Sequence, residues 1–600
     1  MQSFRFSKYT FYFCALFLFV STFFTKRWNE PNNAVLSWDA ADYYLYLPAF
    51  FYDDLGKINN ANEIIDKYNP FGCNFEDANS KVNDNYIIKY TCGIAIMELP
   101  AFIAAHYWAK IANYPVDGFS LPYQICINFW SIAFAVFGLW ILRKTLIKYF
   151  DDTAISITLL ILCFASNLYN FTAFSGNMSH GYLFTLYALL LFYIDRFYEK
   201  PSYKTSVILG FISGLAVLTR PTEIVCLILI ALWKASSLSD IKKRFSFIKN
   251  HFALLIAFSI AAILTGSIQL IYWKIYSGHW IYWSYGQNET FNFLHPHILD
   301  GLFSYKKGWF VYTPVMLLSV IGFYFLYKYF RLFFLPILLY FTFNIYFVFS
   351  WDCWWYGGSF SQRSVVQSYA VLAFSIAALI QSFQKRKFLF LLTSAFIILC
   401  IWLNLLMTYQ AYSSGGIMEN ENMSKKYFWK IFGKTSIDKS DKKFIDLRDE
   451  LPKKLQSKLS VIYETDFDKD SFGDSCNAFS GGKGILLNKS KQESKEITIP
   501  VSSNKKGYYR ASVKVFANEM EWDVWKQAQW VIALYDDEKE VRTNYYRVYR
   551  IIEPNTWQDI TIDIKTPKNK DYNALKIKFW NAESDKELIA DDLKVSFAEN

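Results

Sequence analysis

The chain has 600 residues, of which 53% are hydrophobic and 20% aromatic, and its formal net charge is +10. A soluble domain, a disordered chain and a small disulfide scaffold are excluded, because none of these classes carries so much apolar and aromatic residue. The positive charge is spread over short segments between apolar runs and forms no compact Lys/Arg-rich stretch. It therefore indicates the basic cytoplasmic loops of a membrane protein and not a nucleic-acid surface.

Eleven apolar runs are close to the length of about 20 residues that a helix needs to cross a hydrocarbon core roughly 30 Å thick. The first run has no small-residue cleavage site and is followed by Lys26 and Arg27, so we interpret it as a membrane anchor and not as a signal peptide. The sequence therefore predicts an all-α polytopic membrane domain. The predicted spans are residues 9–25, 122–142, 153–173, 180–195, 204–219, 222–238, 252–273, 309–327, 332–350, 364–384 and 388–408.

A twelfth apolar stretch, residues 93–111, decides the orientation, because counting it as a span would reverse every later segment. It contains Glu98, Pro100, His106 and Lys110, which suit a helix at the membrane surface better than a span. With this stretch at the surface, all five strongly basic connections face the cytoplasm, as the positive-inside rule requires. These connections contain Arg143/Lys144/Lys148, Arg196/Lys200/Lys204, Lys234/Lys242/Lys243/Arg244/Lys249, Lys328/Arg331 and Lys385/Arg386/Lys387.

The same orientation places the remaining connections on the outer side of the membrane. We expect juxtamembrane helices in the long first outer loop, and a multi-pass protein of the inner (cytoplasmic) membrane. Because the number of spans is odd, everything after residue 410 is expected on the outer, periplasmic side. The outer segments are residues 26–121, the segment around Asn177 to His180, the turn at Arg220, residues 275–308 and residues 351–363.

After about residue 413 the composition changes to charged and turn-forming residues. We predict three parts: a membrane domain over residues 1–410, a linker over 411–459 and a separate domain over 460–600. The linker contains one amphipathic piece, around Tyr427 to Phe432. The chain is thus expected to combine a membrane domain with an outer-side domain.

The last part of the chain has the pattern of β structure. Apolar residues alternate in Ile560-Thr561-Ile562-Asp563-Ile564 and again from Leu575 to Phe579, which predicts strands with one buried face. Strands of this length, separated by turns, are typical of an all-β sandwich. The segment from Leu588 to Val595 resembles the last strand of jelly-roll carbohydrate-binding modules, so we expect a jelly-roll-like sandwich of that kind.

Five of the nine cysteines lie in apolar runs, where a thiol packs as a small hydrophobic group. Cys73 and Cys92 lie in the first outer loop, and a disulfide between them is one alternative to two free thiols. The sequence has no CxxC pair of the kind that binds metal.

Two aspartates follow the first predicted span, in the sequence Ser37-Trp38-Asp39-Ala40-Ala41-Asp42-Tyr43. A helix would place Asp39 and Asp42 on one face, about 5 to 6 Å apart at Cβ. Acidic side chains against a membrane surface are costly to desolvate and are therefore usually functional. The alternative is a helix N-cap followed by a solvated acid. We expect Asp39 and Asp42 to be catalytic, since a carboxylate in a dehydrated cleft is suited to act as a general base.

Four cations on the predicted outer side are exceptions to the positive-inside rule. Each alone is most simply a surface charge, but four at the outer ends of different spans would be able to converge on one anion. Arginine makes bidentate contacts to phosphate, and a lipid phosphate at the membrane interface is the natural ligand. The predicted phosphate-binding residues are Arg220, Lys306, Lys307 and Arg363, with Lys307 and Arg363 the most favoured.

Aromatic and histidine side chains in the same loops complete the predicted site. Trp354, Trp355 and Tyr356 are typical of an interface belt, but sugar rings also stack on such faces, and Gly357-Gly358 allows close backbone approach. His180 and His297 have structural alternatives, capping or packing, and His295-Pro296-His297 is weak evidence for a metal. We predict that the substrate contacts Tyr43, Trp354, Trp355, Tyr356, His180 and His297.

Together these motifs resemble the GT-C superfamily of integral-membrane glycosyltransferases, in the branch of protein O-mannosyltransferases and lipid A aminoarabinose transferases. The resemblance covers about residues 1–410. The family's Asp-Glu-x-x-Tyr motif corresponds to Asp39-Ala40-Ala41-Asp42-Tyr43, with Ala40 in place of Glu. Lys89 to Pro100 resembles the family's Lys-Pro-Pro-Leu juxtamembrane helix without the Pro-Pro pair. The segments that resemble bacterial members without an assigned substrate are Leu218–Thr222, Lys306–Pro314 and Trp354–Arg363.

The resemblance implies transfer of a sugar from a polyprenyl-phosphate donor. The leaving group of such a donor is already a stable anion, so the enzyme needs a base for the acceptor hydroxyl and cations for the phosphate. A glycosidase would instead need two acidic residues flanking the bond. We therefore expect an inverting glycosyltransferase that acts at the outer face of the lipid bilayer.

The expected acceptor is a glycolipid, glycan or protein of the cell envelope, and nucleic acid is not expected as a partner. The alternative function is a non-catalytic, membrane-anchored subunit that binds or assembles polysaccharide. No cofactor is certain from the sequence: a divalent metal is an open alternative, although no clear ligand set supports it.

Overall fold

The structure is a computed structural model of the chain. It describes residues 4–29, 34–70, 75, 79–286, 289–413, 416–469, 473–521, 523, 525–568 and 570–600. The chain divides into two compact units, Met1–Gly416 and Ile417–Asn600. Cys73, one half of the predicted disulfide, lies outside the described residues, and Cys92 is buried.

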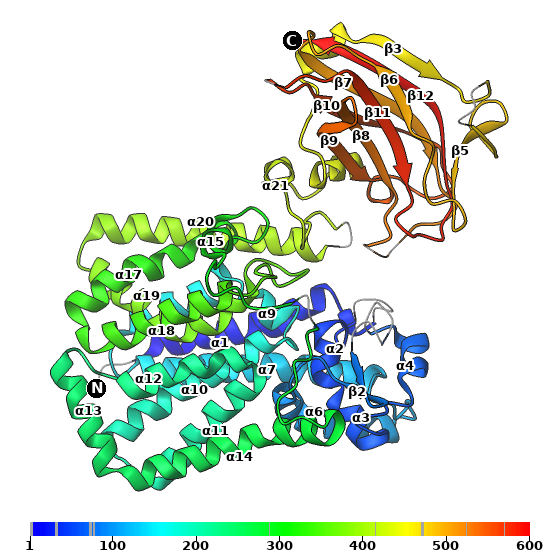
Figure 1. The fold of residues 1–600 in the computed structure, drawn as a ribbon. Coiled ribbons are helices and arrows are strands. Elements are labelled where there is room, and N and C mark those ends of the chain that lie inside the picture. The colour runs from blue at the N-terminus through cyan, green and yellow to red at the C-terminus, as the bar shows by residue number, and fades with distance from the viewer. Residues whose placement is uncertain are drawn as a thin grey trace. The chain divides into compact units, whose positions relative to one another are not determined.

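The first unit is almost entirely helical (Figure 1). Its N-terminal half contains α1 (Arg5–Ser21), η1 (Thr22–Phe24), η2 (Arg27–Asn29), α2 (Asp39–Tyr44), α3 (Tyr46–Tyr52), α4 (Ala61–Tyr68), the short strands β1 (Ser80–Val82) and β2 (Asn85–Ile87), α6 (Gly93–Ile111), α7 (Leu121–Leu146), α8 (Asp152–Leu160), η3 (Ile161–Ala165), α9 (Asn170–Ala173) and α10 (Ser179–Glu199). Its C-terminal half contains α11 (Tyr203–Thr219), η4 (Pro221–Val225), α12 (Cys226–Leu232), α13 (Leu238–Asn250), α14 (Phe252–Ser277), α15 (Ile298–Phe303), α16 (Trp309–Tyr312), η5 (Pro314–Met316), α17 (Leu317–Tyr329), α18 (Arg331–Phe349), η6 (Arg363–Ser368), α19 (Tyr369–Phe383) and α20 (Lys387–Tyr412).

Each of the eleven segments predicted to span the membrane contains helix. Within the described residues, six segments are long and apolar enough to cross a membrane, which marks the chain as a multi-pass membrane protein. These six are Arg5–Asn29, Leu121–Leu146, Phe252–Ser277, Arg331–Phe349, Arg363–Phe383 and Lys387–Tyr412.

Two prolines interrupt the helical runs and thereby position residues of the site: Pro221 lies in the turn between two predicted spans, and Pro314 lies inside a third. Pro221 and Pro314 begin the 3-10 helices η4 and η5, because proline lacks an N–H group and has a fixed φ that suits the first turn of a helix. Arg220, just before Pro221, therefore has extended backbone with φ −149° and ψ 120°. The break leaves this arginine at the end of α11.

The elements of the long first loop gather at one end of the first unit. Figure 1 shows α2, α3, α4, α6 and β2 close together there, whereas the lysine-rich α13 lies at the opposite end. Helix α6 packs against α2, α7 and α11. The helix α2, which carries the two aspartates, is thus packed among the helices of the first loop.

A buried charge cluster joins helices that lie outside the first loop. The Asp195 carboxylate of α10 is 1% exposed and forms ion pairs with Lys148 at 2.7 Å and Lys234 at 2.6 Å. The indole N–H of Trp233 donates to the same carboxylate at 3.3 Å, and the Tyr149 hydroxyl also donates to it. The cluster therefore fixes the ends of α10 and α12 to the turn after α7.

The second unit consists mainly of two antiparallel sheets. The first has the strand order β10-β7-β12-β5-β4, with β3 also paired to β12, and the second has the order β6-β11-β8-β9. The strands are β3 (Ser460–Thr465), β4 (Asp474–Ser475), β5 (Lys483–Leu487), β6 (Ile497–Pro500), β7 (Gly507–Phe516), β8 (Gln529–Asp536), β9 (Lys539–Arg547), β10 (Gln558–Lys565), β11 (Ala574–Trp580) and β12 (Leu588–Glu599), and the short helices are α21 (Lys425–Ile431), η7 (Lys439–Ile445), η8 (Lys453–Lys458) and η9 (Val548–Arg550).

The predicted β structure of the tail is confirmed. Ile560, Ile562 and Ile564 are buried in β10, and Leu575 and Phe579 are buried in β11. The alternation of apolar residues thus identified strands with one face turned to the core.

Residues 417–459 belong to the second compact unit. Asp449 accepts hydrogen bonds from Arg542, the shortest at 2.7 Å, and from Asn544 at 2.9 Å. Asp446 forms an ion pair with Arg547 at 2.6 Å. Ion pairs therefore attach much of the predicted linker to strand β9.

Candidate active site

Asp39 is the first residue of α2, directly after a residue in an unusual backbone conformation. Trp38 has φ 56° and ψ −137°, a region that residues with a Cβ rarely adopt. Tyr356, in the loop at 351–363, also has a positive φ of 54°. Such conformations cost about 1 to 3 kcal/mol each and gather at functional sites. Both segments that line the site thus contain strained backbone.

The predicted catalytic residue Asp39 is paired with a predicted phosphate-binding residue. Its Oδ2 lies 2.7 Å from Nη2 of Arg363, and the two side chains are 28% and 11% exposed. Burial would raise the pKa of Asp39, but the Arg363 charge and hydrogen bonds with Tyr90 and Arg363 outweigh it and hold this pKa below its usual value. Asp39 is therefore ionised and engaged by a guanidinium.

Asp42, the second predicted catalytic residue, has a different environment. It is 6% exposed, and its Oδ1 has no hydrogen-bond partner among the described residues. Burial, followed by the nearby negative charge of Asp39, raises the pKa of Asp42 well above its usual value. The two carboxyl groups therefore differ: the pKa of Asp39 is lowered and the pKa of Asp42 is raised.

Arg220 and Arg363 come from different elements, and Arg363 forms the ion pair with Asp39. Arg220 ends α11, Arg363 begins η6, and the two guanidiniums are close enough to repel each other. Arg220 lies over the ring of Tyr356, 5.8 Å from its centroid. No carboxylate in the described ranges is within 4 Å of the Arg220 guanidinium. The donors of Arg220 thus remain available for an anion.

His180 lies beside this pair of arginines. It is fully buried in the first turn of α10, which packs against η6, and it is within electrostatic range of Arg220 and Arg363. Neither ring nitrogen has a hydrogen-bond partner in the part of the chain that the structure describes. A buried imidazole without partners is costly, so this histidine is suited to bind a polar group next to an anion.

Aromatic rings form one side of the site. The rings of Tyr43 and Tyr90 stack at 4.3 Å, and Tyr90 meets Tyr285 edge-on at 5.8 Å. The Lys89 ammonium lies over Tyr285 and forms an ion pair with Glu289 at 3.2 Å. Sequence reasoning assigned a site role to Tyr43 alone among these residues. The resemblance of the segment beginning at Lys89 to a family motif was the signal for Lys89 and Tyr90.

Both predicted lysines contact the loop at 351–363. Lys306 lies over the Trp355 ring, 3.4 Å from its centroid. Lys307 is 1% exposed and donates to the carbonyl oxygen and hydroxyl of Ser359. These contacts hold the loop that leads to Arg363, and phosphate binding by the two lysines stays a prediction.

His297 and Trp354 are also placed at this loop. Their rings stack with centroids 6.2 Å apart, and His297 Nδ1 lies 3.6 Å from Asp300. Trp354 meets Trp355 edge-on at 5.9 Å. The contacts of these residues are with the loop and α15, whereas Asp39, Tyr43, Arg220, Tyr356, His180 and Arg363 are brought together.

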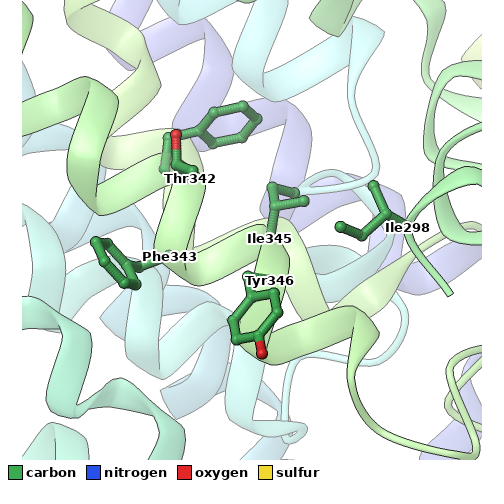
Figure 2. A pocket seen from close by; sticks show the side chains of 6 residues that line it. Ile298, Thr342, Phe343, Ile345 and Tyr346 are labelled. Atoms are coloured by element: carbon green, nitrogen blue, oxygen red, sulfur yellow. The ribbon is translucent and has the colours of Figure 1, made fainter. Parts of the chain in front are cut away.

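An open apolar groove of about 470 Å³ lies on α18, beside the start of α15 (Figure 2). Its lining residues are Ile298, Phe341, Thr342, Phe343, Ile345 and Tyr346. None of them belongs to the predicted site. On a helix that can cross a membrane, such a groove is a surface for lipid chains.

Within the described ranges, no group of three or more His, Cys, Asp or Glu side chains is arranged to hold a metal ion.

Two solved structures are similar to this chain. The apo oligosaccharyltransferase of Archaeoglobus fulgidus aligns with 74% of this chain and 60% of its own, at 13% sequence identity and a TM-score of 0.40. The arabinosyltransferase EmbB of Mycobacterium smegmatis aligns with 83% of this chain and 58% of its own, at 9% identity and a TM-score of 0.33. The chain thus spans less than two thirds of either matched chain. No family model and no curated protein matches the sequence.

One matched protein is an oligosaccharyltransferase and the other is an arabinosyltransferase. Because both TM-scores are below 0.5, we draw no conclusion about function from these similarities. The geometry of the arginines and Asp39 carries the proposal that follows.

Proposed function

We propose that this protein is an inverting glycosyltransferase that moves a sugar from a polyprenyl-phosphate donor to a hydroxyl of a cell-envelope acceptor. The observation that carries the proposal is the ion pair between Arg363 and Asp39, whose pKa is lowered, with a second arginine, Arg220, near Arg363. The pKa of the neighbouring Asp42 is raised. Two cations beside a single charged carboxylate are what transfer from a sugar phosphate requires. A glycosidase would instead need two acidic groups flanking the bond.

In this mechanism Arg220 and Arg363 bind the donor phosphate. Arginine contacts to phosphate are charge-assisted and bidentate, and they stabilise the phosphate as its bond to the sugar breaks. Asp39 accepts the proton of the acceptor hydroxyl as that oxygen attacks the anomeric carbon from the opposite face. The electron pair of the broken C–O bond leaves with the phosphate, so the anomeric configuration inverts.

The neutral groups of the site suit the sugar. The rings of Tyr43 and Tyr356 offer stacking faces, and the unpartnered nitrogens of His180 can exchange hydrogen bonds with sugar hydroxyls. Because its pKa is raised, Asp42 can hold a proton and donate a hydrogen bond without adding charge next to the phosphate. Binding donor and acceptor in one geometry contributes further to the rate.

The topology on which the proposal rests is that predicted from the sequence. Eleven spans and a cytoplasmic N-terminus would place the site at the outer face of the inner membrane. The C-terminal unit, predicted as a jelly-roll-like sandwich over residues 460–600, would then lie on the same side and bind envelope glycan. The sequence boundaries at residues 410 and 459 remain part of this proposal.

The test is transfer of labelled sugar from a polyprenyl-phosphate donor to an envelope fraction by purified protein. We expect Asp39→Asn to lower turnover by about 10²- to 10⁴-fold, the usual contribution of a general base. Transfer by folded Asp39→Asn at the wild-type rate would refute the catalytic assignment. An equal loss of donor binding and of turnover would instead favour a non-catalytic polysaccharide-binding subunit.

A further inference from the structure

Glu223 is a buried carboxylate outside the mechanism described above. It is 1% exposed and lies in η4, and its backbone N–H donates to the carbonyl oxygen of Arg220 at 2.9 Å. The carboxyl group is therefore fixed directly after that arginine. Carboxylates in the membrane-embedded part of a protein are costly to bury and are usually functional.

Both carboxylate oxygens of Glu223 accept hydrogen bonds from other elements. The Tyr187 hydroxyl of α10 donates to Oε2 at 2.7 Å, and Nε2 of Gln367 donates to Oε1 at 2.8 Å. Gln367 is fully buried in η6, whose first residue is Arg363. Glu223 thus joins the helix that follows Arg220 to the helix that begins with Arg363.

Two like-charged guanidiniums need such a connection. Arg220 and Arg363 repel each other, and Asp39 forms its ion pair with Arg363. The Arg220 guanidinium lies over the ring of Tyr356, which exerts a weaker attraction than a carboxylate. The oxygens of Glu223 are directed to Tyr187 and Gln367, so this residue holds the backbone in place without occupying the donors of Arg220.

We infer that Glu223 is a positioning residue whose hydrogen bond to Gln367 sets the separation of Arg220 and Arg363. The inference rests on the proposed phosphate site and adds a residue that sequence reasoning did not identify. Its consequence is that breaking this hydrogen bond weakens phosphate binding even though both arginines and the Glu223 charge remain.

The test uses the full-length protein in detergent, with farnesyl phosphate as the probe and farnesol as its uncharged control. Gln367→Leu removes the donor but leaves the carboxylate, and we expect it to weaken binding of farnesyl phosphate by about 5- to 10-fold and to leave farnesol binding unchanged. The double variant that carries both Glu223→Gln and Gln367→Glu restores a carboxylate–amide hydrogen bond. Its affinity for farnesyl phosphate is expected to lie within about threefold of the wild-type affinity. Glu223→Gln alone keeps an acceptor oxygen and is expected to bind at least as well as wild type.

The matched control is Tyr182→Phe, which removes a buried hydrogen bond of 2.9 Å to Glu98, a carboxylate in a different helix. We expect Tyr182→Phe to lose about as much thermal stability as Gln367→Leu but to keep its affinity for farnesyl phosphate. This result would show that weaker binding by Gln367→Leu is not caused by lower stability alone. Wild-type affinity in Gln367→Leu, or weak binding in Glu223→Gln or in the double variant, would overturn the inference. A wild type that does not prefer farnesyl phosphate to farnesol, or an Arg363→Gln variant that binds like wild type, would overturn the proposed phosphate site itself.

Discussion

The ion pair between Asp39 and Arg363 makes an unusual prediction: removing the catalytic carboxylate should tighten donor binding. In the structure Asp39 occupies the guanidinium that the donor phosphate needs. The phosphate must therefore compete with Asp39 for Arg363. Asp39→Asn replaces a charged competitor by a neutral one of the same size.

The geometry sets the size of the effect. The Oδ2–Nη2 distance is 2.7 Å, with Arg363 11% exposed and Asp39 28% exposed. An exposed ion pair contributes about 0 to 1 kcal/mol, and a hydrogen bond to a charged group about 1.5 to 3 kcal/mol. This partly buried pair lies between the two, at about 1 to 1.5 kcal/mol, which corresponds to roughly 5- to 13-fold tighter binding.

The assay is equilibrium binding of a polyprenyl phosphate to purified wild type and Asp39→Asn. The matched control is Asp42→Asn, because burial raises the pKa of Asp42 and its Oδ1 has no hydrogen-bond partner among the described residues. We expect Asp42→Asn to bind within about threefold of wild type. Unchanged or weaker binding by folded Asp39→Asn would refute the competition between the carboxylate and the phosphate.

Three further predictions follow from the described contacts. Arg363→Gln removes the charge that holds the pKa of Asp39 down. Because a base is active when deprotonated, the acidic limb of the pH profile of kcat/KM should move to higher pH. An acidic limb at the wild-type pH would contradict the role of this ion pair. Arg220→Gln should weaken donor binding by roughly 10- to 150-fold, the equivalent of one charge-assisted contact, as measured by donor titration. An unchanged donor affinity would contradict phosphate binding by Arg220 and would make this residue an interface anchor. Asp195→Asn leaves Lys148 and Lys234 without their shared carboxylate. It should destabilise the protein by about 2 to 3 kcal/mol without changing donor affinity. A wild-type melting temperature of this variant in detergent would show that the cluster contributes little to stability.

The helical segments and the strands could be predicted because both follow from local patterns. The apolar runs are helical throughout the first unit, and the alternation at Ile560, Ile562 and Ile564 gave the buried face of β10. The residue at which each helix ends was less predictable. Pro221 begins a short 3-10 helix inside the connection between two predicted spans, and this break determines where Arg220 lies.

The pairing within the site had no local signal. Asp39 and Arg363 lie near opposite ends of the first unit in sequence, and nothing in the spacing of either residue predicts their contact. The sequence grouped Lys306 and Lys307 with the arginines by predicted side of the membrane, but it gave no signal for their contacts with Trp355 and Ser359. Phosphate binding by these lysines stays a prediction.

Glu223 had a signal that the sequence reasoning did not use. It is an acidic residue at the start of an apolar run, directly after the Arg220-Pro221 turn, and an acid in such a position is a functional candidate by default. Its partner Gln367 was not recognisable, because a buried amide in a helical segment has no distinctive pattern. Only the packing of η4 against α10 and η6 brings the two together.

The most direct test of the central claim is cleavage of the donor by the wild-type protein. Purified full-length protein in liposomes would be given a polyprenyl-phosphate sugar and an envelope acceptor fraction, and the release of polyprenyl phosphate and the anomeric configuration of the product would be measured. The proposed mechanism predicts release of polyprenyl phosphate that depends on the acceptor, with an inverted anomeric centre in the product. No release under conditions in which the donor binds, or retention of configuration, would contradict it.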